Sequence, residues 1–242
     1  MDTFSSLVII TLAALIHASF QLSVSMLTLL SSHTVGAKAK HSKLVHLTGS
    51  FGAGVTVMTL LLVSSTAFIF ERLFPIATPQ IIWAIVCGAM VGLAFSVWSM
   101  YYRRGDGTSL WLPRGLARYL TARTKATKIG GEAFGLGIMS VMAELVFIAT
   151  PIIVAALTLI RLPFSYQLAG LALYIGVSMA SLIIVWILIG SGHRISVVQR
   201  WRESNKRFLQ FAGGSGLLVL GFYIYVDQIL ASETVALSGV LH

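Results

Sequence analysis

Six apolar stretches, each long enough to cross a lipid bilayer, constrain the fold of this chain more than any other feature of its sequence. They run over Phe4–Leu30, Leu47–Phe70, Ile81–Tyr101, Glu132–Ile160, Gln167–Gly190 and Phe208–Leu230. A helix needs about 20 apolar residues to cross a bilayer, and a backbone in lipid must bond to itself, as a helix or a closed barrel. None of the six alternates polar and apolar residues as a barrel strand does. The sequence therefore predicts an all-α integral membrane protein with six transmembrane helices.

The composition leaves no room for a separate soluble domain. Of the 242 residues, 57% are hydrophobic and 10% are charged, whereas a soluble domain carries about 25% charged residues. No basic segment precedes the first stretch and no clear cleavage site follows it, so we expect a retained first helix instead of a signal peptide. Cys87 is the only cysteine of the sequence, which excludes a disulfide framework. We expect a single membrane domain over residues 1–242.

The basic residues predict how these helices are oriented. Of the 17 Lys and Arg residues, all but Arg72 and Arg161 lie in the three loops 31–46, 102–131 and 191–207. Loops rich in Lys and Arg stay in the cytoplasm, so we expect a multi-pass protein of the plasma membrane with both termini outside, including the short tail after residue 230. The net charge of +9 then reflects topology and contact with anionic lipid headgroups at the basic loops. We expect no nucleic acid partner.

The predicted cytoplasmic basic loop, residues 102–131, contains a segment with helical periodicity. The segment begins with a proline, which suits the first turn of a helix. Arg114 and Arg118 then share one side of the helix, and Leu116 and Leu120 share another. Such a helix lies in the headgroup layer of a membrane. The alternative that the sequence leaves open is a disordered basic linker.

The six stretches also divide into two sets of three. A single shift along the chain aligns the second stretch with the fifth, the third with the sixth, and Gln21 with Glu144. Because three is an odd number, the second set crosses the membrane in the direction opposite to the first. Such inverted repeats, here residues 4–101 and 132–230, are typical of secondary transporters that bind their substrates at the midplane.

Glu144 is the one carboxylate in the middle of an apolar stretch. Its position near the centre of Glu132–Ile160 puts it close to the bilayer midplane, where an ionised group costs at least about 2.5–3.5 kcal/mol. Farther along the same stretch, Pro151 lacks a backbone donor and weakens the helix. Because intramembrane acids are rare and usually functional, we predict that Glu144 binds a substrate or an ion. The alternative is a neutral structural acid with satisfied hydrogen bonds.

Polar side chains of the first and fourth stretches complete the predicted site. The predicted substrate- or ion-binding residues are Glu144, His17, Gln21, Ser140, Pro151 and Ser25. The three in the first stretch recur every four residues, which places them on one face of a continuous helix. An inverted two-fold brings the first helices of the two repeats together, so His17 and Glu144 would exchange a proton or hold a cation between them. The alternative for His17 is a packing residue with a satisfied ring, and the identity of any metal is left open.

Glycines predict where the helices approach one another closely. The four-residue spacing of packed membrane helices occurs at Gly88 with Gly92 and at Gly131 with Gly135. A glycine cluster at residues 213–216 opens the sixth stretch, where we expect close packing more than a hinge.

The layout as a whole resembles the lysine-exporter superfamily of small carriers, which includes cadmium- and nickel/cobalt-export families. The resemblance rests on the six spans, the outside termini, the basic first and third loops and the late Pro151 of the fourth span. The segment Gln199–Leu209, before a glycine-rich last span, is also similar to the way several of these families end. In the first span, His17-Ala-Ser-Phe-Gln21 stands where the amino-acid exporters carry Pro-Gly and the cation exporters an aspartate. The resemblance therefore implies a carrier without indicating its substrate.

These observations together predict a secondary transporter that exports a small solute or cation and is coupled to protons. The alternative is a non-transport membrane assembly or scaffold protein in which Glu144 is a structural acid. The sequence contains no recognisable nucleophile, acid pair or ATP-binding P-loop, so we expect neither an enzyme nor a cofactor. A homo-oligomer is left open.

Overall fold

The computed structural model describes residues 3–20, 22–36, 41–100, 114–191 and 195–230, and the regular structure within these ranges is helical throughout. The helices are α1 (Thr3–Ser19), α2 (Leu22–Gly36), α3 (His41–Leu73), α4 (Gln80–Met100), α5 (Arg114–Ala126), α6 (Gly130–Leu159), α7 (Phe164–Ser178), α8 (Ala180–Gly190), α9 (Ile195–Ser204), α10 (Lys206–Ile224) and the π-helix η1 (Tyr225–Leu230). The prediction of an all-α protein is confirmed for this part of the chain.

The described helices include four that are long and apolar enough to cross a membrane: α3, α4, α6, and α10 with η1. The number rises to six if α1 with α2 and α7 with α8 each form one bent span. These two pairs bend by 45° and 53°. The helices are therefore consistent with a multi-pass membrane protein, but the first and fifth stretches each contain a break that the sequence analysis did not predict.

A serine stands at the end of the first helix of each bent pair. The Ser19 hydroxyl donates to the carbonyl of Ile16 at 2.6 Å, and the Ser178 hydroxyl donates to that of Ile175 at 3.1 Å. A serine hydroxyl that bonds a carbonyl of the preceding turn competes with the backbone ladder and bends a helix. Because neither break contains proline or glycine, periodicity alone gave no warning of it.

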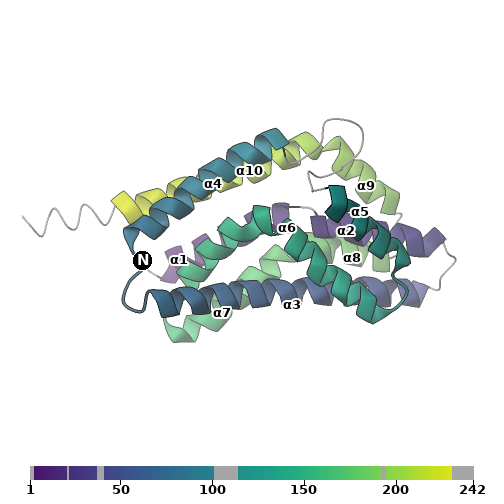
Figure 1. The fold of residues 1–242 in the computed structure, drawn as a ribbon, viewed down its shortest axis with the longest axis horizontal. Coiled ribbons are helices and arrows are strands. Elements are labelled where there is room, and N and C mark those ends of the chain that lie inside the picture. The colour runs from purple at the N-terminus through teal and green to yellow at the C-terminus, as the bar shows by residue number, and fades with distance from the viewer. Residues whose placement is uncertain (1–2, 21, 37–40, 101–113, 192–194, 231–242) are drawn as a thin grey trace, which may run out of the picture.

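The bundle has two distinct ends (Figure 1). Helices α5 and α9, which carry many of the basic residues, lie at one end, named here the basic end, and the N-terminus lies at the opposite end. α4 and α10 run side by side, α3 packs along α6, and α1 contacts α6, α7 and α10. The two bent pairs are neighbours, since α1 packs on α7 and α2 on α8.

At two glycines, the backbones of α3 and α6 approach each other too closely to leave room for a side chain. A Cβ atom added to Gly137 would lie 2.2 Å from the carbonyl oxygen of Phe51, and one added to Gly54 would lie 2.1 Å from that of Phe134. Real Cβ atoms essentially never approach another atom within 3.0 Å. Glycine at both positions is therefore what allows the two backbones to touch.

The expected glycine pairs do not form such contacts. A Cβ atom on Gly88, Gly92, Gly131 or Gly135 would meet no neighbouring heavy atom of the described chain within 4 Å, so these pairs form no close helix contact within the described chain. The four-residue spacing fails here because it says nothing of which helix faces the glycines. Close packing in the cluster at 213–216 is confirmed at Gly214, where an added Cβ would lie 2.2 Å from the Trp98 indole nitrogen.

The periodic segment of the basic loop is a helix, α5, and not a disordered linker. Leu120 is buried, and the Thr124 hydroxyl lies 3.8 Å from the sulfur of Met26 in α2. Arg118 is exposed on the other side. α5 therefore packs with its apolar side on α2 and α6. Residues 102–113 lie outside the described residues.

Candidate functional site

A buried carboxylate with two hydroxyl groups forms the candidate site, which consists of Ser23, Ser140 and Glu144. Glu144 lies near the middle of α6 and its exposed fraction is 2%. The Ser23 hydroxyl donates to Oε2 of Glu144 at 3.4 Å and lies 3.2 Å from the Ser140 hydroxyl. Ser140 also donates to the carbonyl of Gly137 at 2.8 Å. The Ser23 hydroxyl of α2 thus contacts both the Glu144 carboxyl group and the Ser140 hydroxyl of α6.

The site lies at the break between α1 and α2. Ser23 belongs to the first turn of α2, where backbone N–H groups have no partner within the helix. The start of a helix also carries a partial positive charge, which favours a nearby anion. The Glu144 carboxyl group therefore lies beside the first turn of a discontinuous helix, in contact with the Ser23 hydroxyl.

A ring stack and a hydrogen bond connect the residues just before α2 to α6 and α7. Phe20, which directly follows α1, stacks on Phe147 of α6 with ring centroids 5.7 Å apart. The Nδ1 atom of His17 lies 3.0 Å from the Tyr174 hydroxyl, and both side chains are buried. The structure therefore places His17 in a hydrogen bond that joins α1 to α7, one turn before the break.

The other predicted residues are distributed around this site. Ser25 lies farther along α2, and its hydroxyl accepts a hydrogen bond of 2.8 Å from Nη2 of Arg202 in α9. Pro151 is buried in α6, which continues as a helix through it to Leu159, so the expected weakening does not end the helix. Gln21 lies outside the described residues. The structure thus links Ser140 to Glu144 through Ser23, and it pairs His17 with Tyr174 and Ser25 with Arg202.

Sequence reasoning missed three polar residues of this region. They are Ser23, Tyr174 and Arg202. A phenol in the middle of an apolar stretch was a usable signal for Tyr174, because a buried tyrosine hydroxyl usually requires a partner. Arg202 was counted only as a charge that sets topology, and the structure buries it. Within the described ranges, no three His, Cys, Asp or Glu side chains lie close enough to hold a metal ion.

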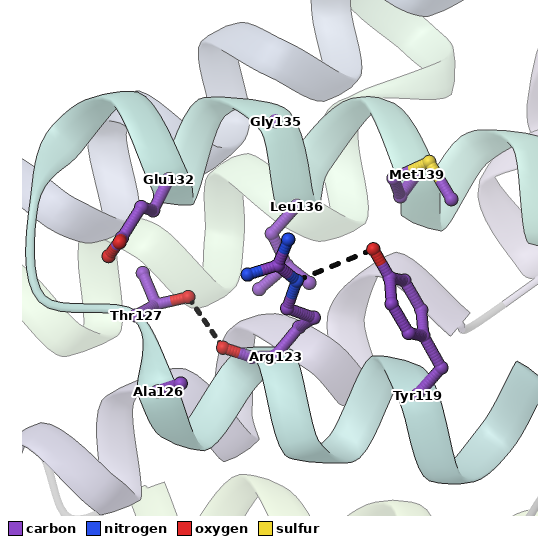
Figure 2. Close-up of a pocket in the computed structure, with 8 residues that line it drawn as sticks. All are labelled: Tyr119, Arg123, Ala126, Thr127, Glu132, Gly135, Leu136 and Met139. Carbon is purple, nitrogen blue, oxygen red and sulfur yellow. Dashed lines mark hydrogen bonds between the residues drawn. The ribbon is translucent and has the colours of Figure 1, made fainter.

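A surface cavity of about 240 Å³ separates α5 from the first turns of α6 (Figure 2). Its lining residues are Tyr119, Arg123, Ala126, Thr127, Glu132, Gly135, Leu136 and Met139. Nε of Arg123 donates to the Tyr119 hydroxyl at 3.4 Å, and this hydrogen bond raises the pKa of Arg123 above its usual value. Glu132 accepts a hydrogen bond of 2.8 Å from the backbone N–H of Lys128. These contacts fix the connection through which α5 joins α6 at the basic end.

A second polar cluster lies at the opposite end. Arg161, in the turn after α6, donates to the side chain of Gln228 in the π-helix, and its guanidinium lies 4.8 Å from the centroid of the Trp83 ring. Burial lowers the pKa of Arg161 below its usual value, and the nearby Asp227 opposes part of this shift. This cluster joins α4, α6 and η1 at the end farthest from α5.

The class of the protein rests on its own sequence and structure. Searches with the chain found no matching family model, no matching curated protein and no matching solved structure. Over the described residues, fold and site define a helical protein with four to six candidate membrane-spanning helices around a buried carboxyl group.

Proposed function

We propose that the protein is a secondary transporter that exports a small solute or cation in exchange for protons, with Glu144 as the group that binds both. The observation that carries the proposal is the position of Glu144: a buried carboxyl group near the middle of α6, contacted by the first turn of a discontinuous helix. Transporters bind ions and substrates where helices break at mid-membrane depth.

Energetics support a functional role for Glu144. An ionised carboxylate at the bilayer centre costs at least about 2.5–3.5 kcal/mol. The neutral acid avoids this cost, while a bound cation compensates the ionised form. Binding of a cation therefore favours release of the proton, and protonation favours release of the cation. This competition couples export to inward proton flow if the site opens to one side at a time.

Helix packing supports the proposed inverted repeats. The proposed equivalence exchanges the first span with the fourth, the second with the fifth and the third with the sixth. Under this exchange, the contact between α3 and α6 corresponds to that between α7 and α1. The contact between α4 and α6 corresponds to that between α10 and α1. All four of these helix pairs are in contact in the structure. The same shift aligns Phe51 with Tyr174 and His17 with Ser140, and all four side chains are buried.

The distribution of charge supports the orientation. If the six apolar segments all span the membrane, the basic end faces the cytoplasm of a plasma membrane and both termini lie outside. Anionic headgroups would then contact the loops at that end. The layout resembles that of the lysine-exporter superfamily, and we propose the same general plan for this chain. Its first span lacks the Pro-Gly pair and the aspartate of the respective members, so the substrate is a separate question.

Reconstitution tests whether the protein transports anything at all. The purified protein is screened by thermal shift against metal ions, amino acids and other small solutes, and each solute that stabilises it is tested in proteoliposomes that contain a pH-sensitive dye. A transporter moves protons only when a stabilising solute and a solute gradient are both present. No solute-dependent proton movement, in a protein that is folded and correctly inserted, would favour a membrane assembly or scaffold protein instead.

A further inference from the structure

A second cavity, lined almost entirely by apolar side chains together with Arg202, lies between α2, α8 and α9 and is named here the Arg202 cavity. Its volume is about 420 Å³, which falls within the range of ligand-binding pockets, about 300–1,000 Å³. Apolar side chains form most of its surface, among them Ile184 and Leu188 of α8 and Val197 of α9. Trp201 and Arg202 close it on the side of α9.

Arg202 is the charged residue among those of the described chain that line this cavity. Its exposed fraction is 2%, and it holds a hydrogen bond of 2.8 Å to the Ser25 hydroxyl. A guanidinium forms its strongest hydrogen bonds with carboxylate and phosphate groups, often as a pair of parallel bonds. An occupant that matches the whole cavity therefore combines an anionic group with a long apolar part.

The rim of the cavity fits an occupant that arrives from the membrane. Ile184, Val197 and Trp201 are all exposed at the surface of the protein. A tryptophan with one apolar side and one polar tip is typical of the layer of lipid headgroups. Figure 1 shows α9 at the basic end together with α5, and anionic lipids are expected at that end.

We infer that the Arg202 cavity binds one anionic phospholipid, whose phosphate contacts Arg202 and whose acyl chain lies along Ile184 and Leu188. The inference does not depend on transport, because it needs only a membrane around the bundle. It also links a lipid to the candidate site, since Arg202 holds Ser25 on the same helix that carries Ser23. A phosphate at Arg202 competes with Ser25 for the guanidinium.

Native mass spectrometry of the purified chain tests the inference. Delipidated protein in detergent is incubated with phosphatidylglycerol or with phosphatidylcholine of identical acyl chains, and the retained lipid is counted. We expect wild type to retain one phosphatidylglycerol in preference to phosphatidylcholine. Arg202→Gln should weaken this retention about tenfold, a loss of about 1.4 kcal/mol. Arg200→Gln removes the same charge from an exposed position of α9 and should retain the lipid like wild type.

Three results would overturn the inference. They are equal retention of the two lipids by wild type, equal retention of phosphatidylglycerol by the two arginine variants, and a thermal shift by inorganic phosphate alone as large as that by phosphatidylglycerol. If Arg202→Gln does not fold, the same lipid retention is measured for Ser181→Phe. Ser181 lines the cavity, so a phenylalanine there fills it while the arginine is kept. Loss of the lipid in Ser181→Phe supports the site, and retention at the wild-type level rejects it.

Discussion

Replacing Gly137 by alanine should destabilise the bundle by forcing α3 and α6 apart. The added Cβ would lie 2.2 Å from the carbonyl oxygen of Phe51 and 2.9 Å from the backbone nitrogen of Val55, whereas ordinary contact begins at 3.4 Å. Both neighbours are backbone atoms, so no side-chain rotation relieves the clash and the helices must separate locally by about 1 Å.

The size of the effect follows from the cost of overpacking. Extra methyl groups in a packed core cost about 1–3 kcal/mol. One kcal/mol shifts the Tm of a chain of this length by about 2–4 °C, so Gly137→Ala should lower Tm by about 2–12 °C. The assay is thermal unfolding of the purified protein in mild detergent, followed by tryptophan fluorescence.

A matched variant separates packing from any general effect of alanine. Gly135 belongs to the same helix, and a Cβ there meets no neighbouring atom of the described chain within 4 Å. Gly135→Ala should therefore leave Tm unchanged within about 2 °C, given the magnitudes above. Gly54→Ala should cost nearly as much as Gly137→Ala, and the double variant less than their sum, because one separation relieves both clashes. Equal Tm values for Gly137→Ala and Gly135→Ala would refute this account of the crossing.

Two further predictions concern topology and the α1–α7 contact. In a background without the native cysteine, single cysteines replace Ile76, which is 99% exposed, or Lys125, which is exposed on α5. We expect an impermeant thiol reagent to reach these two cysteines from opposite sides of the membrane. Reaction of both from one side would contradict the proposed orientation. Tyr174→Phe leaves a nitrogen of His17 without its partner in a buried place and should cost about 1–3 kcal/mol in unfolding free energy. Tyr166→Phe, at an exposed tyrosine of the same helix, is the control and should cost much less, and equal losses would show that the hydrogen bond contributes nothing.

Hydropathy and helical periodicity were sufficient for the long helices and for α5, but not for α9, which lies in the predicted loop 191–207, or for the two breaks. Uninterrupted apolar length predicted every long helix, and the spacing of Leu116 and Leu120 predicted α5. A serine stands at each break, Ser19 and Ser178, and its hydroxyl bonds a carbonyl of the preceding turn. Many serines in membrane helices form such bonds without ending the helix, so the residue type alone does not predict a break.

The break also explains which part of the candidate site was predictable. Ser140 and Glu144 are four residues apart on one unbroken helix, so their shared face follows from the sequence. On a continuous first helix, Ser25 would lie on the face of His17 and Ser23 on nearly the opposite one. The bend changes this arrangement, so that Ser23 meets Glu144 and Ser25 meets Arg202.

Proton-coupled flux through a Glu144→Gln variant tests the central claim most directly. Glutamine keeps the size of the side chain and can hydrogen-bond, but it does not titrate. In proteoliposomes under an imposed pH gradient, with a solute that stabilises the wild type, we expect Glu144→Gln to be folded and inserted but to lose pH-dependent transport. Glu144→Asp should retain part of it with a shifted pH optimum. Glu132→Gln, at the exposed start of the same helix, should transport like wild type. Flux in Glu144→Gln with the wild-type dependence on pH would contradict the account and leave Glu144 a structural acid.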